Sequence, residues 1–162
     1  MKKSQVWYTD FMIGIFIFSI VVIIFYTYAH NAEQDPKVII SDLSVDAKSI
    51  SGSLVSEGYP SNWTSENVVV IGLTDGKQRI VPSKLYMFAD MDYYHTKTML
   101  RTNYEYYFYI EYMNRTKIDI PCPTGLCKSL GSDPNSSSNL ISLSRIVVYD
   151  SKIVNMVVQL WQ

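Results

Sequence analysis

Two cysteines, Cys122 and Cys127, are the first residues whose type and spacing could carry chemistry. Four residues separate them, whereas redox-active pairs use a spacing of two. In an oxidising compartment, two cysteines this close in sequence most simply form a disulfide that closes the loop between them. We therefore expect a structural Cys122–Cys127 disulfide rather than a redox centre.

Three Asn-x-Ser/Thr sequences could accept N-linked glycans, at Asn62, Asn114 and Asn135. Each lies in a segment with the composition of a turn or loop, where a glycosyltransferase could reach it. If this part of the chain is outside the cell, we expect a surface glycoprotein.

The sequence contains no pattern typical of a catalytic, cofactor or metal site. His30 and His95 each lack a second histidine at ligand spacing. Asp90 and Asp92 form an acidic pair that could hold calcium, although such residues more often cap helices. Nucleophile motifs and glycine-rich phosphate loops are absent. We expect no cofactor, no metal and no enzyme activity, since an enzyme would need a catalytic set without any local signature.

Composition describes one neutral, tyrosine-rich domain. The 162 residues include 14 basic and 15 acidic side chains, a net charge of −1, so no basic field is present to hold nucleic acid. Aromatic residues make up 14% of the chain, with 13 tyrosines, which argues against disorder. Charged residues reach only 18%, and this shortfall is concentrated in residues 11–28, which carry no charge.

This uncharged segment predicts a membrane helix over residues 5–30. As a helix, residues 11–28 would span roughly 27 Å, close to the hydrocarbon thickness of a bilayer. Lys2 and Lys3 on its N-terminal side place the N-terminus in the cytoplasm and residues 31–162 outside the cell. The aromatic residues at the two ends resemble interfacial belts: Trp7, Tyr8, Tyr26 and Tyr28.

A removable secretory signal is the alternative interpretation of this segment. Thr27-Tyr28-Ala29 has the small-x-small pattern of a cleavage site. The apolar run is longer than the usual core of a signal peptide, which favours a retained helix.

The elements that follow predict an α+β fold: a long N-terminal helix, apolar and then amphipathic, packed on a mostly antiparallel sheet. Asp35 as N-cap and Pro36 at the first helical position begin an amphipathic helix over residues 36–57. Its apolar residues recur every three or four positions: Ile39, Leu43, Ala47, Ile50 and Leu54.

We expect about five strands in the β-rich region, residues 66–162. A β-branched run at 68–73 should pair with 79–81 across a turn, and helices should follow over 84–89 and from Asp92 to about Arg101. Residues 121–139 have loop composition, and strands are expected at 104–112, 140–149 and 152–161. A bulge near Asn155 would let the last strand switch faces.

The strand over 104–112 alternates tyrosines between its two faces. Tyr107 and Tyr109 on the outer side could stack on sugars or on a neighbouring subunit. Tyrosines also form sheets well without any ligand, so this alternative stays open.

The N-terminus resembles the signal of type IV prepilins, particularly the archaeal type: Lys2 and Lys3, then Ser4, Gln5, and Asp10 at the edge of the apolar run. The resemblance implies that a prepilin peptidase cuts between Ser4 and Gln5, leaving residues 1–4 as leader. The sequence departs from that family in having Ser4 where glycine is usual and the acid at the sixth mature position instead of the fifth.

In such proteins the apolar helix is kept and packs in a filament core. The resemblance implies that Asp10 would neutralise the new terminal amine within the helix bundle, where an unpaired charge is costly. Gly14 and Ser19 would allow close helix approach. The partners would be the lipid bilayer and copies of this chain or of related pilin subunits, with N-linked glycans on the head.

The function expected from this resemblance is a structural subunit of a type IV pilus-like cell-surface filament or pseudopilus. The alternative is a single-pass, membrane-anchored extracellular domain that displays a binding surface and does not polymerise.

Overall fold

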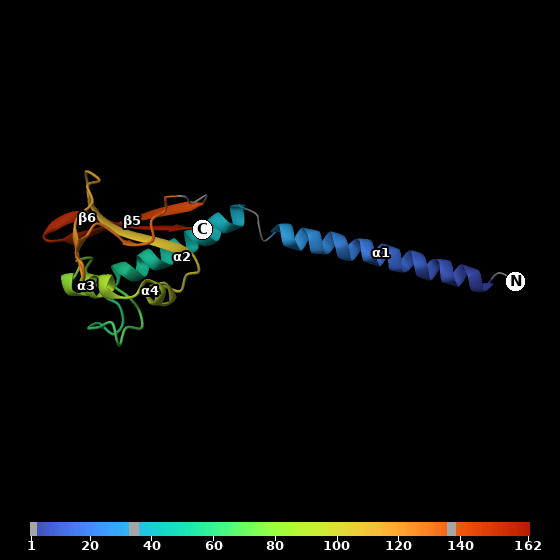
Figure 1. Ribbon diagram of the computed structural model, residues 1–162, viewed down its shortest axis with the longest axis horizontal. Coiled ribbons are helices and arrows are strands. Elements are labelled where there is room, and N and C mark those ends of the chain that lie inside the picture. The colour runs from blue at the N-terminus through green and yellow to red at the C-terminus, as the bar shows by residue number, and fades with distance from the viewer. Residues whose placement is uncertain (1–2, 33–35, 136–138) are drawn as a thin grey trace. The chain divides into compact units, whose positions relative to one another are not determined.

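The computed structural model describes the backbone of residues 3–32, 36–135 and 139–162, with side chains for residues 8–29 and, within those ranges, from residue 40 onwards. The chain divides into two compact units, Met1–Ile39 and Ile40–Gln162. Figure 1 shows both units. The predicted N-cap Asp35 and the junction around it lie outside the described residues.

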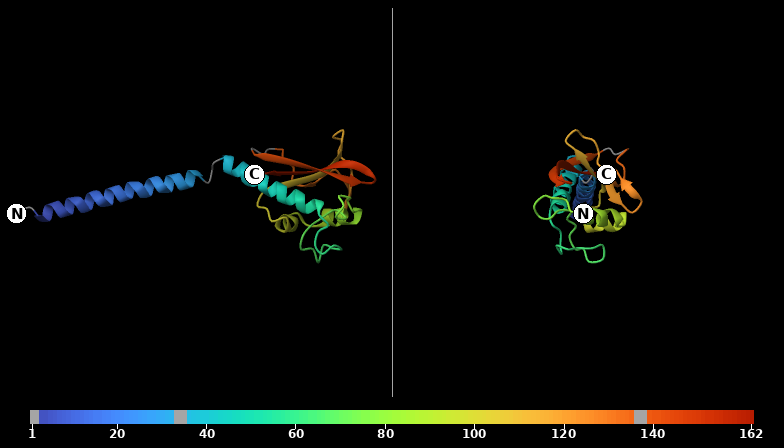
Figure 2. Two further views of the ribbon diagram at one scale, coloured as in Figure 1. Left: turned by 180° about the vertical axis from the view of Figure 1, so that it is seen from behind. Right: turned by 90° about the vertical axis from the view of Figure 1, so that its left-hand side faces the viewer.

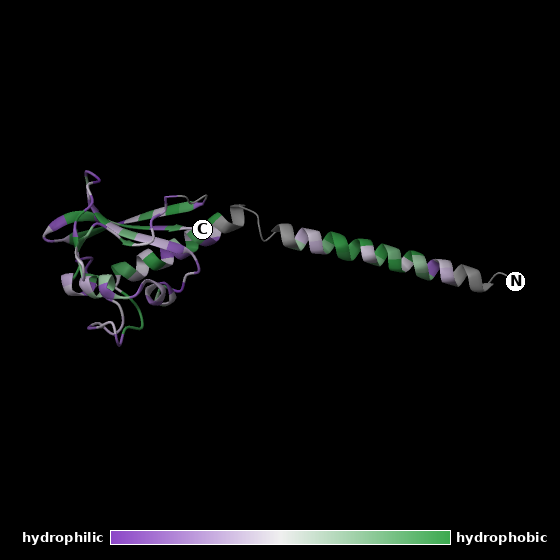
Figure 3. Cartoon of the chain, in the orientation of Figure 1, coloured by the Kyte–Doolittle hydropathy of each residue, from purple (hydrophilic) through white to green (hydrophobic). Residues whose placement is uncertain are grey.

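Helix α1, Lys3–Ala32, makes up most of the first unit. Figure 3 shows that apolar residues surround its middle turns on every side, unlike a surface helix with one apolar stripe. The run of β-branched and aromatic residues there lacks proline, so nothing interrupts the helical hydrogen bonds.

Helix α2, Pro36–Val55, carries the predicted apolar stripe. Leu43, Ala47, Ile50 and Leu54 are all at most 2% exposed. The side chain of Ile39, the first predicted member of the stripe, lies outside the described residues. The helix ends two residues before the predicted boundary at 57, and Gly58 follows with a φ of 79°, a conformation that glycine adopts without strain.

The core lies between α2 and a four-stranded antiparallel sheet. Its strands are β1 (Glu105–Tyr112), β4 (Leu130–Gly131), β5 (Leu140–Tyr149) and β6 (Lys152–Trp161), in the order β4-β1-β6-β5. Helices α2, α3 (Pro82–Asp90) and α4 (Tyr93–Met99) cover one face of this sheet, which we name the inner face (Figure 2). The predicted α+β class is confirmed.

Alternation along β1 places its apolar side chains on the inner face. Tyr106, Phe108 and Ile110 are buried there, and the ring of Phe108 meets that of Phe88 from α3 edge-on, with centroids 5.3 Å apart. The half-buried residues between them lie on the opposite, outer face. This confirms the strand predicted at 104–112.

The bulge predicted near Asn155 is wrong. Asn155 pairs in register with Glu111 on one side and Ile146 on the other. The strand needs no bulge because both of its faces are covered at this point. Met156 and Val158 are buried on the inner face, while Val157, 3% exposed, is buried on the outer one.

The hairpin predicted between 68–73 and 79–81 is present only at its turn, without regular strands: Thr74 and Ile80 form an antiparallel bridge, and Val81 N–H donates to Leu73 O at 2.9 Å. The other side of this segment bonds to the end of α2: Leu73 N–H donates to Leu54 O at 2.9 Å, and Thr74 N–H to Ser56 O at 3.2 Å. The segments around Gly72 and Gly58 approach each other so closely that a Cβ on Gly72 would lie 2.2 Å from the backbone nitrogen of Gly58.

The two helices predicted after this region are present with shifted ends, whereas the loop predicted over 121–139 is wrong in part. Helix α3 begins at Pro82, and α4 begins after Asp92 and ends at Met99. The segment predicted as loop, 121–139, contains most of a two-stranded sheet, β2 (Ile120–Cys122) with β3 (Gly125–Cys127), as well as the short strand β4.

Candidate functional site

Among the described residues, an extensive exposed apolar surface lies on α1. Residues Tyr8–Ala29 form a helix of 22 residues, long and apolar enough to cross a membrane, of which 0% is buried within the chain. It is the only such helix among the described residues. An apolar helix of this length near the N-terminus is typical of a membrane span or of a signal sequence.

Two hydroxyl side chains within this surface bond to the backbone of the helix itself. Ser19 Oγ donates to Ile15 O at 2.9 Å, and Thr27 Oγ1 donates to Ile23 O at 2.8 Å. These bonds satisfy the hydroxyl groups without water, as an apolar environment requires. Gly14 has no atom within 4 Å of the position of a Cβ, so a neighbouring helix could approach closely there.

The predicted leader residues are only partly described. The backbones of Ser4 and Gln5 lie in the first turn of α1, while their side chains lie outside the described residues. Asp10 is exposed on the same helix, one residue before the apolar run.

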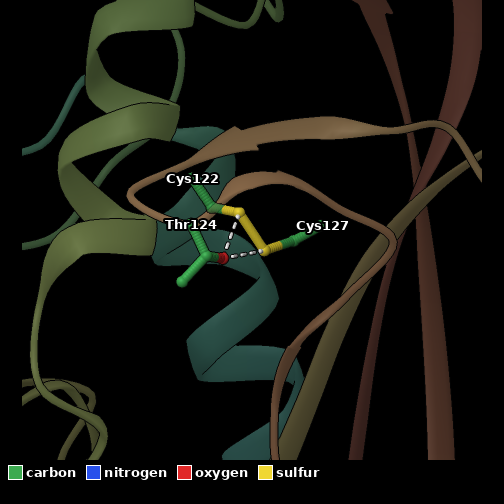
Figure 4. The surroundings of a disulfide bond; sticks show 3 residues. All are labelled: Cys122, Thr124 and Cys127. Carbon is green, nitrogen blue, oxygen red and sulfur yellow. Dashed lines mark hydrogen bonds between the residues drawn. A yellow bond between two sulfur atoms is a disulfide. The ribbon is translucent and has the colours of Figure 1, made fainter.

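The structure contains the predicted disulfide between Cys122 and Cys127. The sulfur atoms are 2.04 Å apart and join the two strands of the β2–β3 hairpin. Figure 4 shows Thr124 between them, with Oγ1 3.4 Å from Cys122 Sγ and 3.7 Å from Cys127 Sγ. Cys122 is buried against the domain, so the disulfide fixes a hairpin rather than presenting a reactive sulfur.

The three predicted glycosylation sites are exposed, but their surroundings differ. Asn62 precedes Trp63, which is 1% exposed and donates its indole N–H to Gly72 O at 2.8 Å. Asn114 instead heads a turn after β1 whose three residues are all exposed, and its Oδ1 accepts the N–H of Thr116 at 3.1 Å. Asn135 is exposed as well, while the two serines after it lie outside the described residues.

Asp92 caps α4 as predicted, because its carboxylate accepts the N–H groups of Tyr94 and His95 at 3.0 and 3.1 Å. Asp90 ends α3 on the surface. In the part of the chain that the structure describes, no three metal-ligating side chains come together. The side chain of His30 lies outside that part.

Tyr107 and Tyr109 lie side by side on the outer face of the sheet, with ring centroids 5.6 Å apart. The Nζ of Lys117 lies over both rings, 4.8 and 4.5 Å from their centroids, and donates to the hydroxyl of Tyr107 at 3.0 Å. The ammonium group therefore lies over one face of each ring and holds the two tyrosines and Lys117 together as one cluster.

Sequence reasoning missed a buried lysine. Lys84 on α3 is 7% exposed, and its Nζ donates to Glu57 O at 2.7 Å and Thr74 O at 3.1 Å. The ammonium group therefore binds carbonyls just beyond the end of α2, where a cation is also favoured by the helix dipole. A lysine at the start of a short helix gives no signal of this in the sequence.

A second cluster that the sequence did not indicate joins α4 to β1. The carboxylate of Glu105 accepts from Lys97 Nζ at 2.7 Å and from the hydroxyl of Tyr93. The lysine and then the tyrosine hold the pKa of Glu105 below its ordinary value. Burial and the bond to Glu105 raise the pKa of Tyr93, and burial raises that of Tyr106, stacked on it at 5.0 Å, to about 12.

Comparisons with known proteins return nothing: no family model matches the sequence, no curated protein is similar to it, and no solved structure matches its fold.

Proposed function

We propose that this chain is a structural subunit of a type IV pilus-like cell-surface filament or pseudopilus, assembled through its N-terminal helix. The observation that carries this proposal is the apolar surface of Tyr8–Ala29, of which none is buried within the chain. Such a helix needs an apolar environment, and a bundle of identical helices supplies one as well as lipid does.

The sequence at the start of this helix supports assembly after cleavage. A cut between Ser4 and Gln5 would leave a terminal amine close to Asp10, and the two opposite charges could then be buried together in a bundle. Before assembly the helix would span the bilayer, with the N-terminus in the cytoplasm and residues 31–162 outside the cell.

The head has features suited to an external surface. Its disulfide is typical of oxidising compartments, and its sequons at Asn62, Asn114 and Asn135 would carry glycans there. We assign it no enzyme activity, because the described polar clusters serve structural contacts.

A second candidate function is an anchored domain that displays the head and does not polymerise. Two departures from the prepilin signal favour it, because they argue against cleavage: Ser4 stands where glycine is usual, and Asp10 lies one position later than the acid of the family pattern. In this case the chain would keep residues 1–4, and its N-terminal helix would remain a single membrane span.

The test is intact mass and N-terminal sequencing of the protein from native membranes and from sheared cell-surface material. We expect a start at Gln5 in the sheared, high-mass fraction. A start at Met1 or Lys2, confined to membranes, would overturn the filament and support the anchored domain. A start near His30 would identify a secreted protein and remove the helix from the mature chain.

An Asp10→Asn variant separates assembly from cleavage. We expect it to be cut at the same bond and to be lost from the sheared fraction, because the buried amine would lack a counter-charge. Asp42→Asn, an exposed aspartate on α2, is the matched control and should assemble normally.

A further inference from the structure

The two edges of the main sheet are protected very differently. Along β1, two segments bond to the outward backbone groups. In the first, β4 pairs with Phe108 and the next residue, Ser132, donates its N–H to Tyr106 O at 3.0 Å; in the second, Ile118 N–H donates to Ile110 O at 2.8 Å. Tyr112 N–H donates to Thr116 O at 2.9 Å. No open edge is left on this side.

Strand β5 forms the other edge, and the bonds of Val148 show which of its backbone groups are directed outward. Val148 N–H donates to Gln78 O at 2.9 Å and its carbonyl accepts from Ile80 N at 2.8 Å, both away from β6. The pairing of β5 with β6 runs without a break. Because alternate residues of a strand bond to opposite sides, every second residue before Val148 is also directed outward: Leu140, Ser142, Ser144 and Ile146.

These four residues have no backbone partner on their outer side among the described parts of the chain. The usual protections of an edge are missing too, since the stretch has no proline, no glycine, no bulge and no lysine. Its one charged residue, Arg145, has its side chain on the inner face, where Nε donates to Ser51 Oγ at 3.2 Å.

We infer that β5 pairs antiparallel with β5 of a second copy of this chain, centred on Leu143, to form a continuous eight-stranded sheet. A two-fold axis at Leu143 brings Leu140 opposite Ile146 of the partner and Ser142 opposite Ser144 of the partner. All four outward residues of each copy are then paired, with about eight backbone hydrogen bonds. Any other register leaves one of these four residues unpaired or requires the partner strand to bond to Val148, whose outward groups already bond to Gln78 and Ile80.

The side chains in this register are complementary. Leu140 is 43% exposed and Ile146 is 60% exposed, and the pairing covers each with the other. Ile153, 61% exposed on β6 and diagonal to Ile146 on the same face, extends this apolar contact. The two arginines do not oppose each other, because Arg145 faces Ile141 of the partner and the two Arg145 positions lie about 13 Å apart along the strands.

Space for the partner lies beside the edge. An open hollow of about 550 Å³ is lined by Gly52, Val55, Gln78, Ser144, Arg145 and Ile146. Gly52 has no atom within 4 Å of the position of a Cβ, so α2 leaves the inner side of the edge open. The partner's Ile141, opposite Arg145 on that side, has room to enter.

Disulfide cross-linking of the full-length chain in detergent micelles tests the register. Leu143 meets its own copy at a non-hydrogen-bonded pair, where Cα atoms are about 4.5 Å apart, within disulfide range. Under mild oxidation we expect Leu143→Cys to give about tenfold more cross-linked dimer than Ile141→Cys, whose copies lie beyond the ~7 Å limit. The wild-type chain, whose two cysteines are already bonded to each other, is the blank.

A proline variant tests the edge itself. Ser144→Pro removes an outward N–H that makes no bond within the sheet, so an edge strand tolerates it, whereas the partner strand loses a hydrogen bond and meets the ring. Added to Leu143→Cys, it should abolish cross-linking, and Ser144→Ala should not.

Equal cross-linking at positions 141 and 143 would overturn the proposed register. Absence of cross-linking at both would overturn the pairing. The cysteine variants alone decide this if the proline variant fails to fold, and neither result depends on whether the chain forms filaments.

Discussion

At the scale of single residues, the side chain that does most to join distant parts of the head is Lys84. A lysine is rarely buried without a counter-charge, because its ammonium loses hydration. Here two main-chain carbonyls from different segments, at Glu57 and Thr74, replace the lost water. The lysine thereby fixes the close passage of the 72–74 segment against the end of α2.

Replacing Lys84 with methionine should lower the free energy of unfolding by about 1–3 kcal/mol, because methionine fills the volume of the side chain but leaves two carbonyls without their charged donor. Urea unfolding followed by tryptophan fluorescence measures this, since Trp63 in the core becomes exposed on unfolding. Ser83→Ala, at the exposed neighbouring position, should stay within about 0.5 kcal/mol of wild type. A methionine variant as stable as that control would show that the lysine bonds contribute nothing.

At the scale of elements, helix α4 is held to β1 by polar contacts more than by an apolar face. Only Thr96 among its residues is buried, whereas Lys97 and Tyr93 both bond to Glu105 on the strand. The strength of this link should therefore depend on the charge of one carboxylate.

Glu105 makes the link sensitive to acid. Its pKa is lowered in the folded chain, first by Lys97 and then by Tyr93, so its contribution is present above the unfolded pKa of about 4.5 and is lost as pH falls through the folded value. The group is 42% exposed, and solvent screening limits its contribution. Between pH 7 and pH 3, wild type should lose about 0.5–1 kcal/mol more stability than Glu105→Gln.

Urea unfolding at several pH values measures this difference. Glu111→Gln, on the same strand and face but outside the ion pair, should follow wild type at each pH. If Glu105→Gln follows wild type as well, the ion pair does not stabilise the fold.

The elements with regular periodicity could be predicted from the sequence. The stripe of Leu43, Ala47, Ile50 and Leu54 and the alternation of β1 depend only on local spacing and on one buried face. The β-branched run at 68–73 has the same local signal as a strand, but it pairs with 79–81 only at the turn, and Leu73 N–H donates to a carbonyl of α2. No local pattern indicates a partner in α2, so the sequence predicts a longer hairpin than the structure contains.

Polar contacts between distant segments could not be predicted from the sequence either, because no local pattern indicates their partners. Lys84 binds residues 57 and 74, and Arg145 binds Ser51, far apart along the chain. The disulfide could be predicted because its two cysteines lie within one short loop. The spacing of two residues in the sequence predicts a contact between them only when the chain that joins them is too short to hold them apart.

At the scale of the whole molecule, the proposed membrane orientation and the three sequons depend on each other. Residues 31–162 receive N-linked glycans only if they reach the side of the membrane where the transferase acts. Glycan occupancy therefore reports the orientation of α1 independently of filament assembly.

The folded head also ranks the sequons. At Asn114 the whole acceptor sequence is exposed in a turn, whereas Asn62 precedes the buried Trp63, and Thr64 is bonded through N–H and Oγ1 to Asn67 Oδ1 at 2.6 and 3.2 Å. A transferase that meets the folded head must unfold the core around Trp63 to reach Asn62, whereas it can bind the sequence at Asn114 in its folded conformation.

In native membranes, Asn114→Gln should therefore reduce the intact mass by one glycan, while Asn62→Gln should change it only by the substitution itself. Intact mass spectrometry of the two variants beside wild type measures both. Equal losses at both positions would mean that transfer precedes folding, so that folding does not select the site. Loss at neither would contradict the external placement of the head if Asn135→Gln is also without effect, because all three sequons would then lie on the side without the transferase.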